Sequence, residues 1–240
     1  MKSTIGFKGV RKMAPRTKLK DRLLPDYTRG EEIANMVTHI VGGAFGIVAL
    51  ILCVVFSALR KDAYYVVGSA IYGSSLIALY TMSSVYHGVH PNVEMGKKVL
   101  QVLDHCTIYY LIGGTYTIVA LGPLREYRTW IGWTIFGVVW GLCAFATVFT
   151  AIDFEKYTKL SMGCYIGIGW IIILAVKPTI AALTIPGFIY LLLGGISYTV
   201  GASLYAIDEK KRYIHATFHI FVLLGTALQF VSIFKYAILR

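Results

Sequence analysis

Apolar residues gather in seven long runs along the chain, and short polar segments separate each run from the next. A helix needs about 20 mostly apolar residues to cross the hydrocarbon core of a bilayer. The fifth run is the shortest, and its ends are the least defined. The runs are Ile33–Leu59, Ala63–Val85, Val99–Leu121, Trp130–Thr150, Leu160–Val176, Thr184–Ala206 and Ile214–Ile238. This pattern predicts an all-α integral membrane protein, folded as a bundle of seven transmembrane helices.

Composition supports a membrane protein rather than a soluble domain. The 240 residues are 57% hydrophobic and only 15% charged, which is unusual for a soluble domain of this length. The short connections leave no room for a separate folded domain. We therefore predict a basic N-terminal tail over residues 1–32 and one membrane domain over residues 33–240. The tail lacks the apolar core of about 7–15 residues that a cleavable signal peptide needs, so we expect the first span to direct insertion.

The net charge of +11 comes largely from the tail, which holds nine Lys or Arg residues and four acidic ones. A basic segment beside a span is attracted to anionic lipid of the cytoplasmic leaflet, or it acts only as a topology signal. Nucleic-acid binding is a poor explanation in a membrane protein. With alternating spans, the side of the tail carries 16 Lys or Arg residues and the other side carries seven. We therefore predict a cytoplasmic N-terminus and an external C-terminus, in the plasma membrane.

Local signals add detail to this outline. Thr28 and Glu31 have the spacing of a capping box, which predicts a helix start there. Glycines four residues apart permit close helix approach at three places: Gly42/Gly46, Gly137/Gly141 and Gly163/Gly167. The four cysteines lie inside apolar runs without C-x-x-C spacing, so we expect free, buried thiols: Cys53, Cys106, Cys143 and Cys164.

The six histidines share one feature: with alternating spans, every one falls at the cytoplasmic end of the membrane domain. They are His39, His87, His90, His105, His215 and His219. Asp104 joins them, five residues into the third span. A carboxylate in an apolar segment costs several kcal/mol unless it is paired or hydrated, and such residues usually mark function. The alternative is an ion pair with Lys97 or Lys98.

His215 and His219 are four residues apart, which places both rings on one face of a helix and suits two ligands of one metal ion. The competing interpretation is a pair of interfacial histidines on the membrane surface. A catalytic zinc ion commonly has three protein ligands and one open position. The third ligand is His87, His90 or His105. We favour His87, because it continues the helical register of its span, whereas His90 precedes Pro91 and His105 points away from its neighbour Asp104.

Together these segments resemble the hemolysin III family of bacterial membrane proteins, relatives of the progestin and adipoQ receptors, which include the adiponectin receptors, and more distantly of the alkaline ceramidases. The resemblance covers almost the whole membrane domain. It rests on the segments Glu32–His39, Ser83–His87, Leu103–His105 with Gly114–Thr117, and His215–His219 running on to Gly225. Two positions depart from the family pattern, Ile118 and Gln229, and neither belongs to the histidine motifs.

The resemblance implies seven helices, an internal N-terminus and a Zn²⁺ ion near the cytoplasmic face. By analogy, His87, His215 and His219 would bind the metal. Asp104 would hold the water at the metal, and Ser83 would support that network. The ligand set agrees with the choice of His87 made above.

Three functions remain open. The first is a zinc-dependent hydrolase of a lipid amide or ester, in which Asp104 transfers the proton. The second is a receptor-like regulator of membrane lipid state with a structural zinc ion, for which Asp104 or His105 would supply a fourth ligand. The third is a pore-forming hemolysin or channel, which the scarcity of ionisable groups inside the spans does not favour. In each case the expected partner is membrane lipid.

Overall fold

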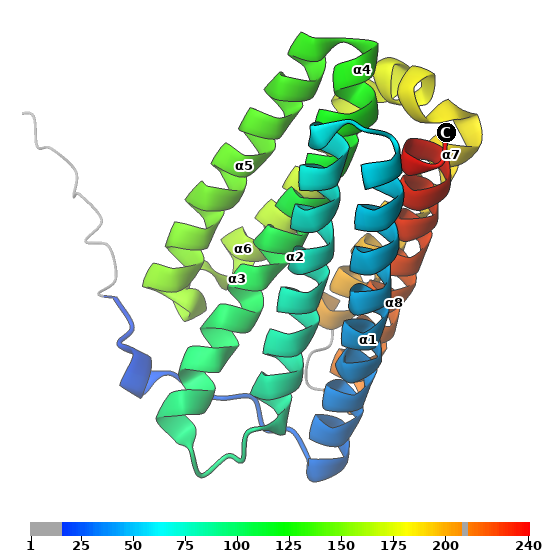
Figure 1. Cartoon of the computed structure of the whole chain (residues 1–240). Coiled ribbons are helices and arrows are strands. Elements are labelled where there is room, and N and C mark those ends of the chain that lie inside the picture. The colour runs from blue at the N-terminus through cyan, green and yellow to red at the C-terminus, as the bar shows by residue number, and fades with distance from the viewer. Residues whose placement is uncertain (1–15, 208–210) are drawn as a thin grey trace, which may run out of the picture.

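The computed structural model describes residues 16–207 and 211–240, and within these ranges every regular element is helical. The chain forms one elongated bundle (Figure 1). The α-helices are α1 Arg29–Leu59, α2 Ala63–Gly88, α3 Glu94–Val119, α4 Arg125–Tyr127, α5 Thr129–Ile152, α6 Phe154–Gly169, α7 Val176–Ile207 and α8 Ile214–Ile233. Two short 3₁₀ helices, Leu19–Asp21 and Ile171–Ala175, and two π-helical turns, Ala120–Leu124 and Phe234–Ile238, complete the fold.

Six helical stretches in the described chain are long and apolar enough to cross a membrane. The fifth of them, Phe154–Ala206, contains 53 residues and would be about 80 Å long if straight, well over twice the thickness of the hydrocarbon core. It is not straight, because Thr184 interrupts it with a φ of 68°. In Figure 1 the yellow part of the chain, which includes the start of α7, crosses the end of the bundle near the C-terminus before the rest of α7 runs back along α8. The predicted fifth and sixth spans both lie within this interrupted stretch.

Local capping determines where the first helix begins. The Thr28 side chain accepts a hydrogen bond from the Glu31 N–H, and the Glu31 carboxylate accepts one from the Thr28 N–H at 2.9 Å, so the predicted capping box is confirmed. The helix therefore begins at Arg29, four residues before the apolar run itself. The predicted division between tail and membrane domain at residue 32 thus falls inside α1.

The spatial order largely follows the chain: α1 packs on α2, α2 on α3 and α3 on α5, and α8 closes the bundle against α7 and α1. Of the six candidate spans α3 is the most buried, with 78% of its most apolar window inside the bundle. A Cβ atom at Gly114 would lie 2.2 Å from the Ser75 hydroxyl oxygen, so glycine is what lets α3 approach α2 this closely. Asp104 and His105 lie on this central helix.

The three predicted glycine pairs differ in whether they pack against a neighbouring helix. Gly42 and Gly46 face Tyr80 and Leu76 of α2, so this pair does pack a helix interface. The other two pairs have no heavy atom within 4 Å of a Cβ placed on them, so the packing expected of them does not occur within the described part of the chain. The four cysteines are free, as expected, although two of them are only partly buried.

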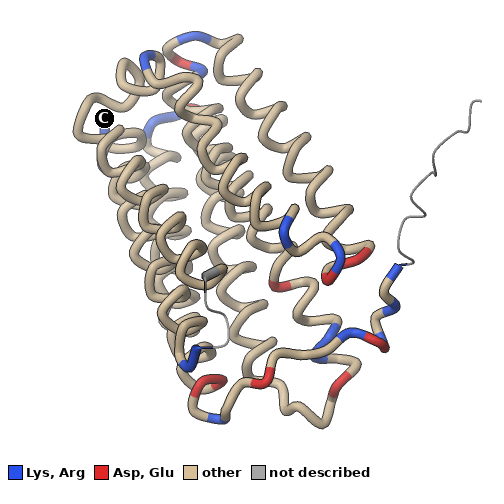
Figure 2. Tube along the Cα trace, turned by 180° about the vertical axis from the view of Figure 1, so that it is seen from behind, with Lys and Arg blue, Asp and Glu red and all other residues tan. Residues whose placement is uncertain are grey.

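The surface of the bundle suits a lipid environment. Large apolar side chains are exposed along α1, α5 and α7, whereas charged positions lie mostly in turns and at helix ends (Figure 2). At the end away from the histidines, Arg60 donates hydrogen bonds to the C=O groups of Ile238 and Arg240 at 3.0 and 2.7 Å, and Arg125 pairs with Asp62. The Arg60 bonds tie the C-terminus to the α1–α2 turn, and the Arg125–Asp62 pair ties the segment after α3 to the same turn.

Candidate metal centre

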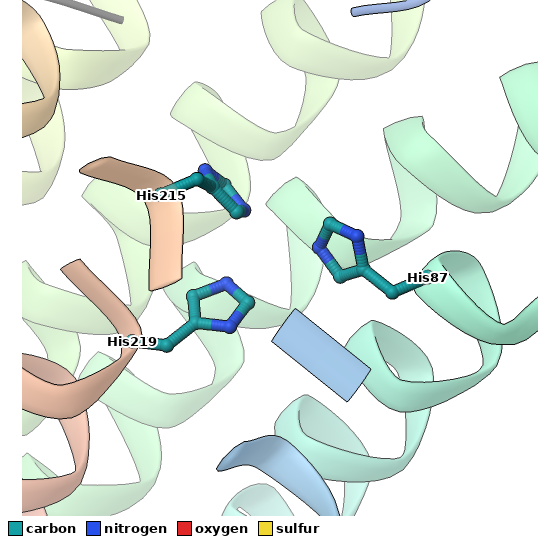
Figure 3. Close-up of side chains that lie close together, drawn as sticks. All are labelled: His87, His215 and His219. Atoms are coloured by element: carbon teal, nitrogen blue, oxygen red, sulfur yellow. The ribbon is translucent and has the colours of Figure 1, made fainter. Parts of the chain in front are cut away.

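Three histidine side chains converge at one end of the bundle, which we call the histidine end: the end where α1, α3 and α8 begin and α2 finishes (Figure 3). His87 lies in the last turn of α2, and His215 and His219 lie in the first two turns of α8. One ligand nitrogen from each histidine lies within 4.8 Å of the other two, and all three residues are buried. A group of this kind is able to bind a metal ion.

In two of these rings, Nδ1 makes a hydrogen bond. His87 Nδ1 lies 2.6 Å from the Glu32 carboxylate, and His219 Nδ1 donates to the backbone C=O of Asn35 at 3.2 Å. Both partners belong to α1. With Nδ1 occupied, each ring has Nε2 left for a ligand, and His87 Nε2 and both nitrogens of His215 are buried without a hydrogen-bond partner in the described structure. Buried unpaired imidazole nitrogens at this spacing fit a zinc ion with histidine ligands.

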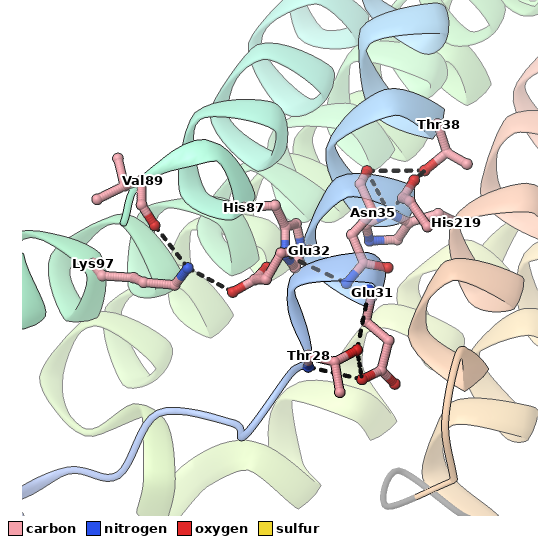
Figure 4. Close-up of polar contacts among 10 residues, drawn as sticks. Thr28, Glu31, Glu32, Asn35, Thr38, His87, Val89, Lys97 and His219 are labelled. Carbon is pink, nitrogen blue, oxygen red and sulfur yellow. Dashed lines mark hydrogen bonds and ion pairs between the residues drawn. The ribbon is translucent and has the colours of Figure 1, made fainter. Parts of the chain in front are cut away.

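α1 has a role in this arrangement that the sequence motifs did not predict. Glu32 contacts His87 with one carboxylate oxygen and the Lys97 ammonium with the other, and Lys97 also donates to the C=O of Val89 (Figure 4). A signal was available in the sequence: Glu32, Asn35 and His39 recur at intervals of three and four residues at the start of α1, which places them on one face.

Asp104 is buried, 7% exposed, and it lines a cavity together with Ser83, His215 and His219. Ser83 is a close polar neighbour of Asp104, but the pair falls short of a formed hydrogen bond. The ion pairs considered for Asp104 do not form. Lys97 bonds to Glu32 instead, and Lys98 pairs with Glu94 at 2.6 Å.

The remaining three histidines do not belong to the group of three. His39 is buried and stacks on His219 with 3.6 Å between ring centroids. His105 donates its Nδ1–H to the C=O of Gln101 and packs its ring on Phe154. His90 is exposed in the loop after α2, where it accepts a hydrogen bond from Asn92. All six histidines nevertheless lie toward the same end of the bundle, as the sequence predicts.

A cavity of about 150 Å³ begins at this site and extends into the bundle between α3, α6, α7 and α8. Most of its lining is apolar or aromatic, and its inner end passes Tyr116, Trp170 and Gln229. A smaller cavity of about 30 Å³ shares these three residues and continues between the α6–α7 connection and α7. The carboxyl group of Asp104 and the imidazole groups that line the cavity thus lie at its histidine end.

The segment before α1 covers the histidine end from outside. The Tyr27 ring lies 5.3 Å from the His215 ring and 5.9 Å from the His87 ring. Burial is the main reason that the pKa of the Tyr27 phenol is raised well above its ordinary value, so Tyr27 remains neutral. Further back along the segment, the Thr17 N–H donates to Asp153 at 2.7 Å, between α5 and α6.

Comparison with known proteins agrees with this picture. The family model described as Haemolysin-III related matches residues 27–230. Hemolysin-3 of Bacillus cereus is 40% identical over 209 residues, which cover 87% of this chain and 92% of that protein. The Hemolysin-3 homolog of Bacillus subtilis (strain 168) is 38% identical over 88% of this chain and 97% of its own length. Human monocyte to macrophage differentiation factor is 28% identical over 86% of this chain and 84% of its own length. A multi-span helical membrane protein with these matches belongs to the hemolysin III family.

Proposed function

We propose that this protein is a zinc-dependent hydrolase of a membrane lipid amide or ester. The observation that carries the proposal is the convergence of three buried histidines, with free ring nitrogens, at the polar end of an apolar cavity that also contains Asp104. Only His87, His215 and His219 form such a group within the described residues. Three protein ligands are typical of a catalytic zinc ion with an open position, whereas a structural zinc ion takes four.

The residues divide into distinct roles. His87, His215 and His219 hold the metal, which supplies Lewis-acid polarisation of a carbonyl and activation of water when bound. Asp104 accepts a proton from the attacking water and delivers it to the leaving nitrogen or oxygen. Ser83 adjoins Asp104 and is placed to support the network around its carboxyl group. The apolar remainder of the cavity excludes bulk water and accepts the acyl chain of the lipid.

We further propose seven spans, with the histidine end and the N-terminus in the cytoplasm. The interruption at Thr184 supports two spans within Phe154–Ala206 rather than one. The excess of Lys and Arg on the side of the tail supports the orientation. The basic tail would then meet anionic lipid at the cytoplasmic surface.

The metal is tested by elemental analysis of detergent-purified protein, with wild type beside His219→Ala. We expect about one zinc ion per chain in wild type and its loss in the variant. Glu94→Gln is the control, because it removes an exposed carboxylate at the same end of the bundle. Absence of metal from wild type prepared without chelators would refute the zinc site.

The reaction is tested with Asp104→Asn, which keeps the size of the side chain and removes its ability to take a proton. We expect zinc to stay bound while hydrolysis of N-acyl amides or acyl esters in liposomes falls by a factor of roughly 10²–10⁴. Unchanged turnover would exclude Asp104 as the base. No turnover by zinc-loaded wild type, with unfolding on zinc removal, would instead favour the receptor-like alternative.

A further inference from the structure

The carboxylate of Glu32 joins two buried partners at the start of α1. Its Oε2 lies 2.6 Å from His87 Nδ1, and its Oε1 lies 2.6 Å from Lys97 Nζ. The side chains of His87 and Lys97 are 0% and 3% exposed, and that of Glu32 is 14% exposed. Removing charged groups from water costs several kcal/mol for each ion unless the partners compensate. The arrangement therefore calls for an explanation beyond the anchoring of a helix end.

The contact determines which nitrogen of His87 carries the hydrogen. An ionised carboxylate only accepts hydrogen bonds, so Nδ1 of His87 must be the protonated nitrogen. The Asn35 side-chain nitrogen lies 3.5 Å from the same atom and does not compete with an oxygen at 2.6 Å. The lone pair of the neutral ring is then on Nε2, the buried nitrogen that has no hydrogen-bond partner among the described residues. Glu32 thus selects the tautomer that presents Nε2 to a metal ion.

Lys97 fixes Glu32 in turn. Its ammonium group bonds to Glu32 Oε1 and to the C=O of Val89 at 2.9 Å, so the carboxylate is held from the side opposite His87. Lysine, carboxylate and imidazole form a chain that spans α3, α1 and α2. A carboxylate hydrogen-bonded to a ligating histidine orients the ring and raises its basicity toward the metal.

We propose that Glu32 is a positioning residue for the metal ligand His87, and that Lys97 holds Glu32 in the position required. The proposal rests on the metal centre of the proposed function but not on the hydrolysis reaction. It assigns a function to two charged residues that do not line the described cavity. It also explains why a lysine at the start of α3 is almost fully buried.

The test is the zinc affinity of Glu32→Gln and Glu32→Ala, measured by competition with a chromophoric chelator. Glutamine keeps the size and one acceptor oxygen but loses the charge, and alanine loses the contact entirely. We expect affinity to fall by roughly 10-fold in Glu32→Gln and roughly 100-fold in Glu32→Ala, the range found for partners of this kind. Glu94→Gln, which removes the other lysine–carboxylate pair at the start of α3, should bind zinc like wild type.

A second readout separates positioning from folding. Glu32→Gln leaves the buried Lys97 ammonium without its carboxylate, so the unfolding temperature of the zinc-free protein should fall. Zinc affinity is therefore compared where both zinc-free proteins are folded, and the visible spectrum of the cobalt(II)-loaded variant should change. Wild-type affinity and spectrum in both Glu32 variants would overturn the proposal, as would loss of the fold in both without metal. A wild type that binds no zinc would refute the metal centre, and this proposal with it. A response of affinity to Glu32 without lipid turnover would leave the positioning role intact and refute only the hydrolase.

Discussion

At the scale of single residues, close packing of α1 against α2 depends on glycine. A Cβ atom placed on Gly73 would lie 2.6 Å from the Cα atom of Leu50, which is backbone and cannot rotate away. Gly137 on α5 has no such neighbour within 4 Å. Both residues are helical glycines in a membrane protein, yet only the first is required by a neighbouring backbone. Substitutions to alanine at the two positions should therefore change the free energy of unfolding in opposite directions.

Gly73→Ala should lower the free energy of unfolding by about 1–3 kcal/mol, the usual cost of overpacking a tight interface. Gly137→Ala should be neutral or stabilising by up to about 1 kcal/mol, because alanine favours the helix over glycine. Thermal unfolding in detergent, followed by circular dichroism, measures both changes. Equal unfolding temperatures for the two variants would show that α1 and α2 separate freely at this contact.

At the scale of elements, the segment before α1 belongs to the fold and not only to a solvated tail. Asp153 receives the Thr17 N–H and also caps α6 by accepting from the Lys156 N–H at 3.1 Å. Burial alone would raise the pKa of Asp153, but these two N–H groups and the nearby Arg22 cation hold the pKa of that carboxyl below its ordinary value. The charge on Asp153 therefore helps to attach residues 17–22 to the α5–α6 turn.

This attachment should weaken in acid. A group whose pKa is lowered by folding contributes stability that is complete above its unfolded pKa of about 3.9 and is lost as the pH falls through the folded pKa. Hydrogen-exchange protection of residues 17–22, corrected for intrinsic rates, should thus decline below about pH 4 in wild type. Asp153→Asn should show weaker protection at neutral pH and no decline in this window. Asp21→Asn, which changes an exposed acid in the same segment, should behave like wild type.

At the scale of the whole molecule, the number of spans determines the relation between the two termini. An odd number of spans places the N-terminus and the C-terminus on opposite sides of the membrane, and an even number places them on the same side. Six stretches qualify by length and composition, but Phe154–Ala206 is interrupted at Thr184 and is long enough for two crossings. The seven-span interpretation therefore makes a prediction that the six-stretch count does not.

Reporter fusions at the two termini test the seven-span interpretation. With seven spans and a cytoplasmic N-terminus, alkaline phosphatase fused after Arg240 should be active outside the cell, and green fluorescent protein at the same place should be dark. The same two reporters fused before Met1 should give the opposite pattern. Both termini on one side would refute the seven-span count. A reversed pattern at both termini would retain the count and refute the orientation.

The amino-acid sequence alone predicts the local features of the fold. The apolar runs, the Thr28–Glu31 capping box and the four-residue spacing of His215 and His219 depend only on residues close together in the chain, and backbone geometry converts them directly into helices and shared faces. The choice of His87 as the third histidine also agrees with the structure, because its helical register extends that of its span.

The tertiary structure alone decided the rest, because the remaining features join residues far apart in the chain. Glu32 and His87 are 55 positions apart, and Asn35 and His219 are 184 positions apart. Hydrophobic periodicity does not encode such pairings, nor does it show that Asp104 faces a cavity rather than Lys97 or Lys98. Helix packing decides which polar groups meet in an environment without water, and there each buried donor or acceptor must find a partner within the protein or a ligand. The sequence by itself therefore determined the helices and the residues able to bind a metal, and the packing of α1, α2 and α8 determined how those residues are held.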